Sequence, residues 1–142
     1  MGSANFRTIN TGATAEDAFD QAVAQAQNEY GCEGYTGTIA EKDGFLLVKL
    51  PLNIEAELVV GALDLAQFGD SDYLSDRQEA MKSIAFLAEN FVNADNLLAC
   101  YLNKWAPALC FKLRPPEIVQ WGKYNTLPEH QDVFLFAGHA SE

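Results

Sequence analysis

The residues best suited to chemistry lie in a glycine-rich stretch at positions 31–42, where Gly31, Gly34 and Gly37 recur at every third position. Its reactive and hydrogen-bonding side chains belong to Cys32, Tyr35, Thr36, Thr38 and Glu41. Backbone N–H groups and hydroxyls in such a loop can hold a small ligand or contact a partner protein. A nucleotide loop is not expected, because no Gly-Lys-Ser/Thr sequence opens a helix here. The stretch is therefore a candidate contact loop, with a purely structural glycine-rich turn as the alternative.

Nucleophilic or metal chemistry finds little support in the sequence. A reactive Cys32 needs a histidine brought to it by the fold, and the chain offers His130 and His139, both expected at the surface. The three cysteines and two histidines show neither CxxC nor HxxxH spacing. We therefore assign no catalytic residue and expect no metal site and no cofactor.

Acidic residues form the second candidate site. The chain has a formal net charge of −11, and between Asn53 and Glu79 it carries seven acids against one base, Arg77. The seven are Glu55, Glu57, Asp64, Asp70, Asp72, Asp76 and Glu79. Such a surface suits a protein partner with a basic cleft, including one that normally binds nucleic acid. Solubility alone is the alternative explanation of the charge.

The same charge excludes several classes of partner. A chain with a pI near 4.4 lacks the basic face that releases counterions from nucleic-acid phosphates or binds anionic lipid.

The other sequence features concern the compartment. No apolar run approaches the ~20 residues of a membrane span. Three cysteines are too few for a disulfide framework, and no leader-like segment opens the chain. We expect a protein of the reducing cytoplasm that binds neither nucleic acid directly nor membranes.

Hydrophobic spacing predicts the elements that position these residues. In the first half we expect a strand over Asn5–Asn10 and a helix from the Thr14 cap to Tyr30. A hairpin should follow, with Tyr35–Ala40 and an inner strand Phe45–Leu50 joined by the Asp43-Gly44 turn.

The second half is predicted to begin with helices and end with strands. Helices are expected over Ile54–Gln67 with Asn53 as cap, from a Ser75 cap to a kink near Asn93, and over Asn96–Trp105. Strands are expected at Ala108–Leu113, Ile118–Trp121 and Asp132–His139, with a loop at Leu127–Gln131. Segregated strands and helices predict one α+β domain over residues 1–142, with two layers and an antiparallel or mixed sheet covered on one face by three to four helices.

A further indication comes from three sequence patches. The motif Gly34-Tyr35-Thr36-Gly37-Thr38-Ile39-Ala40-Glu41-Lys42, the segment 104–108 and the ending 134–141 resemble a group of small acidic proteins of bacteriophages and mobile elements. In that group the motif also follows an alanine-rich helix. This chain has Cys32 and His139 where the group has His and Trp, so no role is carried over to these two positions. The resemblance implies a bacterial-host context and brings no settled activity.

Three functions remain open on the sequence. The first is a soluble acidic factor of phage or mobile-element type that binds a host protein and acts as an anti-defence inhibitor, its acids imitating nucleic-acid phosphates. The second is a ligand-binding domain or enzyme that uses the loop 31–42. The third is a structural subunit whose exposed strands pair in a homo-oligomer.

Overall fold

A four-stranded mixed sheet forms the centre of the computed structural model, which describes residues 2–115, 117–118 and 131–142. The strand order is β1 (Ser3–Gly12), β4 (Asp132–Ser141), β3 (Ala108–Lys112) and β2 (Phe45–Leu47). The pairs β1–β4 and β3–β4 are antiparallel, and β2–β3 is parallel. The α+β class and the mixed sheet are confirmed.

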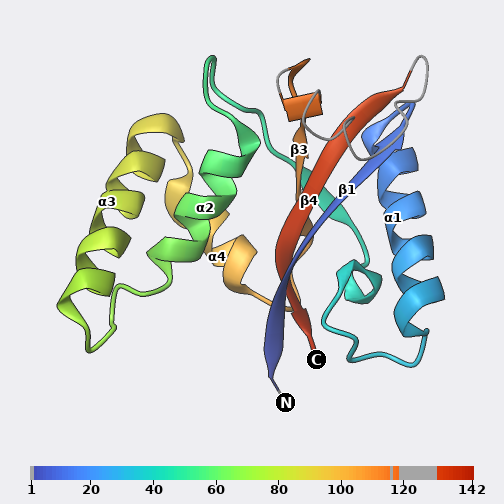
Figure 1. Cartoon of the computed structure of the whole chain (residues 1–142), viewed down its shortest axis with the longest axis horizontal. Helices are drawn as coiled ribbons and strands as arrows, with labels where there is room; N and C mark the ends of the chain where they lie inside the picture. The colour runs from blue at the N-terminus through green and yellow to red at the C-terminus, as the bar shows by residue number, and fades with distance from the viewer. Residues whose placement is uncertain (1, 116, 119–130) are drawn as a thin grey trace.

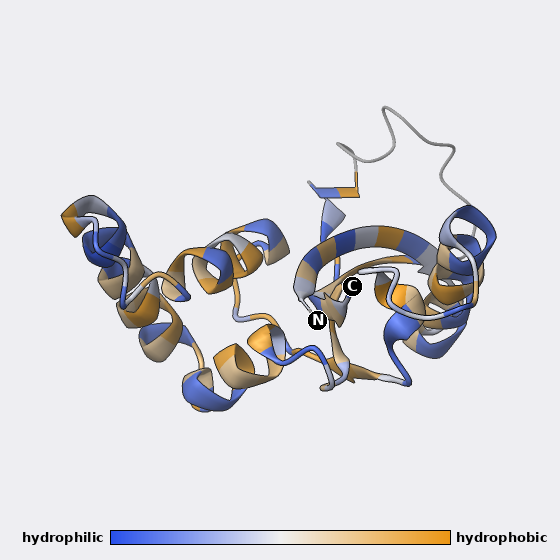
Figure 2. Cartoon of the chain, turned by 90° about the horizontal axis from the view of Figure 1, so that it is seen from below, coloured by the Kyte–Doolittle hydropathy of each residue, from blue (hydrophilic) through white to orange (hydrophobic). Residues whose placement is uncertain are grey.

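Helices cover both faces of this sheet, so the expected two-layer arrangement with one covered face is not what forms. On one face α1 (Ala15–Tyr30) packs on Phe134 and Phe136 of β4. On the other face α2 (Ala56–Ala66) and α4 (Ala94–Leu102) pack on the alternate β4 residues, and α3 (Leu74–Asn90) packs mainly on α2 (Figures 1 and 2). The reason is that β3 and β4 are apolar at nearly every position, which suits strands buried on both sides.

The first strand and helix agree with expectation because their signals are local. Thr14 has extended backbone angles and its hydroxyl accepts a hydrogen bond from the Asp17 N–H at 3.2 Å. Gly31 ends the helix with φ of 91°. Phe19 faces inward, with its ring centroid 5.8 Å from that of Phe136. A capped amphipathic helix thus covers one side of β4.

The predicted hairpin does not form. Tyr35 has a φ of 58°, which breaks any extended strand, and residues Ile39–Glu41 make a short 3₁₀ turn, η1, capped by the Thr38 hydroxyl. The strand that follows pairs with β3, far away in the chain, and lies at the edge of the sheet. Its residues Leu46 and Leu47 are 48% and 56% exposed, so the expectation of an inner strand was wrong.

The helices of the second half are present, but their ends differ from the prediction. Asn53 has a φ of 66° and does not cap α2; the N–H of Ala56 instead donates to the Glu117 carboxylate at 2.8 Å. Tyr73, not Ser75, precedes α3. At Phe91 the backbone is extended, so the expected kink near Asn93 is a break between two helices.

Some expectations fall outside the described residues. Of the predicted strand Ile118–Trp121 only Ile118 is described, and its backbone is helical. His130 and most of the predicted loop Leu127–Gln131 also lie outside the described part of the chain. The strand predicted over Asp132–His139 is confirmed as β4 and extends to Ser141.

Candidate functional site

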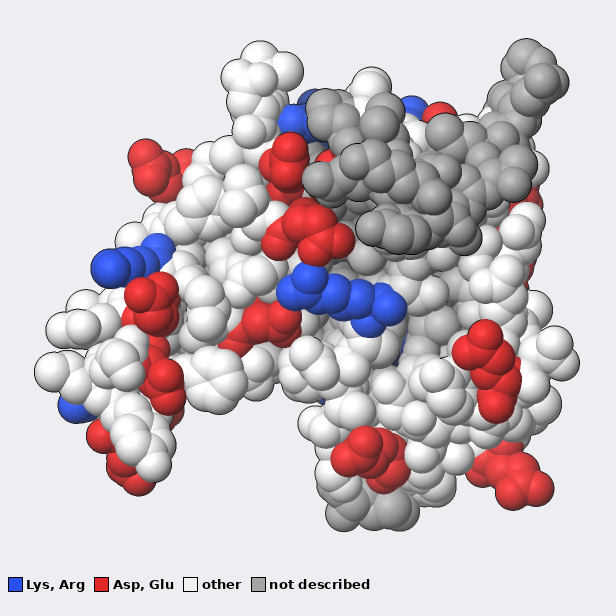
Figure 3. Space-filling model, in the orientation of Figure 1, with Lys and Arg blue, Asp and Glu red and all other residues white. Residues whose placement is uncertain are grey.

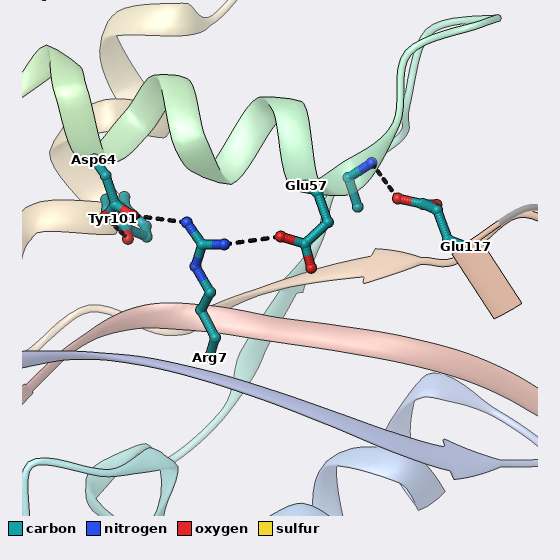
Figure 4. A network of polar contacts seen from close by, with 6 residues as sticks. Arg7, Glu57, Asp64, Tyr101 and Glu117 are labelled. Carbon is teal, nitrogen blue, oxygen red and sulfur yellow. Dashed lines mark hydrogen bonds and ion pairs between the residues drawn. The ribbon is translucent and has the colours of Figure 1, made fainter. Parts of the chain in front are cut away.

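The acidic residues of the stretch 55–79 divide into two groups with different surroundings. Glu57 and Asp64 lie on the same face of α2, and each accepts a hydrogen bond from the Arg7 guanidinium on β1 at 2.8 Å (Figure 4). The Asp64 carboxylate is the more buried of the two, with 24% of its side chain exposed against 50% for Glu57. One guanidinium thus binds both carboxylates and ties α2 to the sheet, and because it carries one positive charge against two negative ones, the group keeps a net negative charge.

Asp64 also accepts a hydrogen bond from the buried Tyr101 hydroxyl of α4. The Tyr101 ring stands edge-on to His139 of β4, with 5.0 Å between centroids, and its backbone carbonyl lies 2.9 Å from His139 Nδ1. His139 is buried, so the expectation of a surface histidine was wrong. Within the described residues no hydrogen bond joins it to Cys32, which is exposed.

The electrostatics of this cluster favour a structural role over acid–base chemistry. Burial, then the hydrogen bond to Asp64, raise the pKa of Tyr101 well above its usual range. For Arg7, burial acts to lower the pKa, but the hydrogen bond and charge of Asp64 together with the charge of Glu57 act against it, and the pKa is raised. The Tyr101 phenol keeps its proton and Arg7 keeps its charge near neutral pH, and both bind the Asp64 carboxylate, so the cluster holds elements together and does not transfer protons.

The remaining acids are exposed, and all except Glu55 lie between the end of α2 and the first half of α3. Asp70 and Asp72 are in the turn between these helices, Asp76 and Glu79 are in the first turns of α3, and Glu55 precedes α2. Within the described residues Asp70 and Asp72 form no ion pair, and Glu79 makes only an exposed one with Lys82 at 3.8 Å. Figure 3 shows acidic side chains along the α3 side of the molecule, with basic side chains between them.

Large apolar side chains are exposed beside these acids. Phe68 is 45% exposed, Tyr73 72%, Leu74 61% and Met81 69%. All four lie at the end of α2, in the turn, or on the first half of α3. We call the surface made by residues 68–81 the α2–α3 tip. Exposed apolar residues rimmed by charge are typical of protein interfaces.

The glycine-rich loop satisfies its own polar groups. The Glu41 carboxylate accepts hydrogen bonds from the Tyr35 N–H at 3.0 Å, the Thr36 N–H at 3.3 Å and the Thr36 hydroxyl at 2.7 Å. The Thr36 and Thr38 hydroxyls are 2.8 Å apart. The structure thus brings together four of the five predicted loop residues, Tyr35, Thr36, Thr38 and Glu41, while Cys32 is exposed. The groups expected to hold a ligand are already used inside the loop.

Lys42 is a buried cation that sequence reasoning missed. Its ammonium group donates to the backbone carbonyls of Ala106 at 2.6 Å, Lys104 at 3.2 Å and Asn103 at 3.4 Å. Burial lowers its pKa. The sequence predicts a turn at Lys42-Asp43-Gly44, and no local pattern marks Lys42 as buried, because its partners lie 61 to 64 residues away in the chain. The residue joins η1 to the segment between α4 and β3.

Other chemistry and comparisons add no function. In the described part of the chain no cluster of three or more His, Cys, Asp or Glu residues is arranged to hold a metal ion. Within the same residues no helix is long and apolar enough to cross a membrane. No family model matches the chain, and neither curated proteins nor solved structures gave a match.

Proposed function

We propose that this chain is a protein-binding factor that contacts a basic partner through the α2–α3 tip. The observation that carries the proposal is the coincidence of exposed carboxylates with exposed apolar side chains on one projecting end of the fold. Aromatic and apolar residues supply most of the binding energy of an interface, and charges around them give orientation and association rate. Tyr73 is the central candidate anchor, with Asp70, Asp72 and Asp76 around it.

The partner that best suits this surface is a protein with a basic cleft that binds nucleic acid. Carboxylates spaced along a turn and a helix start can occupy positions where phosphates would otherwise bind. Together with the resemblance to phage and mobile-element proteins, this supports a role in the cytoplasm of a bacterial host as an anti-defence inhibitor. Glu57 and Asp64 are left out of this contact, because they face β1 and share the Arg7 guanidinium there.

The test is a charge reversal with a matched control. The variant Asp70→Lys, Asp72→Lys, Asp76→Lys changes the net charge by the same amount as the control Asp20→Lys, Glu33→Lys, Asp43→Lys, whose three acids are exposed elsewhere. Both are compared with wild type for capture of basic proteins from bacterial lysate, at low and high salt and with a DNA duplex as competitor. Loss of one DNA-competed protein in the tip variant alone supports the proposal.

Two results would contradict this function. Equal capture by wild type, tip variant and control means that the tip is not the contact. Equal loss in tip variant and control means that only net charge matters. Circular dichroism melting checks folding, since removing the acid at the start of α3 costs up to about 1 kcal/mol.

A further inference from the structure

β1 is an edge strand whose free side can be read from the register. Among the described strands it pairs only with β4, and the Glu142 N–H donates to the Gly2 carbonyl at 3.3 Å. With Ser3 opposite Ser141, even-numbered residues of β1 exchange hydrogen bonds with β4. The backbone N–H and C=O groups of the odd-numbered residues therefore point away from the sheet.

Most of these outward backbone groups have no partner in the part of the chain that the structure describes. Among the described residues nothing hydrogen-bonds the backbone groups of Asn5, Arg7 or Ile9. Only near the end of the strand is a donor used, where the Thr11 N–H donates to the Asn10 side chain at 2.9 Å. A run of unpaired backbone groups on a long strand is a template for another strand.

β1 also lacks the features that usually protect an edge. Its ten residues include no proline and no lysine, and its single charged side chain, Arg7, is held against α2. The opposite edge strand, β2, is only three residues long and is soon followed by Lys49 and Pro51. Short strands, lysine and proline discourage pairing with another strand. The β2 edge is therefore protected against strand addition, and the β1 edge is not.

A groove runs beside the unprotected edge, between β1 and α1, which lie next to each other in Figure 1. It has a volume of about 460 Å³ and is lined by Phe6 and Thr8 of β1, Gln25 and Glu29 of α1, and Thr38. A strand added to β1 would direct every second side chain into this groove, because side chains alternate between faces. The other side chains would point to the α2 face, where Glu57 lies.

Charge decides which strand would bind. Glu29 on the groove face is exposed and forms no ion pair within the described residues, and Glu57 on the other face is half exposed. The whole chain carries −11, so a second copy would be repelled and a basic segment attracted. We propose that the β1 edge binds an extended segment of a partner protein that carries Lys or Arg opposite these acids, as a fifth strand of the sheet. This surface is separate from the α2–α3 tip.

A defined probe tests the mode of binding. The full chain is used as bait for a displayed library of random decapeptides, and the affinity of the most enriched peptide is measured by fluorescence anisotropy. N-methylating its amides one at a time should weaken binding by roughly three- to tenfold at every second position, because only alternate N–H groups face β1. A loss without two-residue alternation, or no enriched peptide, overturns the proposal.

Variants of the protein test the charge and the occupant. Glu29→Lys should weaken the enriched peptide by about two- to fivefold. Asp20→Lys, an exposed acid on the opposite side of α1, should leave affinity unchanged. If Glu29→Lys and Asp20→Lys change the affinity for the peptide equally, Glu29 has no specific role in binding. A dimer in sedimentation equilibrium that the peptide dissociates would assign the edge to a second copy and overturn the choice of partner.

Discussion

At the residue scale, Asp64 joins three elements through one carboxylate. One oxygen binds the Arg7 guanidinium of β1 and the other accepts the Tyr101 hydroxyl of α4, while Asp64 itself belongs to α2. Loss of this carboxylate would leave a buried phenol without an acceptor and remove one of the two partners of Arg7. Glu57, by contrast, makes a single contact that is half exposed to water.

We therefore expect the two acids to differ in their effect on stability. Asp64→Ala should lower the free energy of unfolding by about 1–3 kcal/mol, because a buried donor loses its partner. Glu57→Ala should cost less than about 1 kcal/mol, since exposed ion pairs contribute little. Urea denaturation followed by tryptophan fluorescence measures both. An equal or larger loss for Glu57→Ala would contradict the bridging role of Asp64.

At the element scale, the loop between α1 and β2 is fixed to the ends of the sheet by Gly37. This residue has a φ of 69°, and its N–H donates to the Ser141 carbonyl at 2.8 Å. A Cβ added here would lie 3.1 Å from the Ala4 Cβ and 3.3 Å from the Glu142 Cβ. Gly44, in the same connection, has open space around its missing Cβ.

Gly37→Ala should accordingly destabilise the protein by about 1 kcal/mol or more, through left-handed backbone strain and the close approach to β1. Gly44→Ala serves as the matched control and should change stability by less than about 0.5 kcal/mol. Thermal melting of the two variants beside wild type decides the matter. If both melt alike, the glycine at 37 is not required by the fold.

Elements whose signals are local could be predicted, and those that depend on distant residues could not. Thr14, with its acid three positions later, gave the start of α1 correctly because the cap is made within the helix. Asn53 looked equally suitable, yet the N–H of Ala56 is bound by Glu117, 61 residues away. The parallel pairing of Phe45–Leu47 with β3 could not be predicted either, because its partner strand is also far away in the chain.

The candidate site was predictable as a list of residues but not as an arrangement. The sequence singled out the acids at 55–79 and the loop at 31–42, but it could not separate acids bound by Arg7 from acids left in solvent. That separation arises because β1 passes in front of α2, a contact between residues 50 or more positions apart. The internal bonds of Glu41 were missed because Tyr35–Ala40 was predicted as a strand.

At the scale of the whole molecule, the sheet separates two surfaces that could serve different partners. The α2–α3 tip belongs to the helices on one face, while the groove beside β1 opens between the sheet edge and α1 on the other. Arg7 and its two acids lie between them and connect the sheet to α2 (Figure 4). A variant of one surface should therefore leave the other intact, which allows the two proposals to be tested independently.

The buried protonated groups also predict how stability responds to alkaline pH. Burial raises the pKa of the Cys110 thiol to about 12. In the unfolded chain the same thiol titrates near pH 8.5. The native state then holds more protons than the unfolded state, so stability is fully present below about pH 8.5 and falls as the pH rises. Lys42 acts in the opposite direction, because burial lowers its pKa. Its ammonium group loses its proton in the native state before it does so in the unfolded state, which raises stability as the pH rises.

We expect the free energy of unfolding, measured with urea under reducing conditions, to decline between pH 8.5 and 10.5 by up to about 1.4 kcal/mol per pH unit for the Cys110 thiol. Cys110→Ala should be less stable at neutral pH but should show a shallower decline, because the titrating group is gone. Cys32→Ala, which removes an exposed thiol, should keep the wild-type slope. Tyr101→Phe should flatten the curve only above about pH 10, where an unfolded phenol titrates. Identical slopes for wild type and Cys110→Ala would show that the buried thiol does not set the alkaline limit, and a change of slope in Cys32→Ala would move that role to the exposed cysteine.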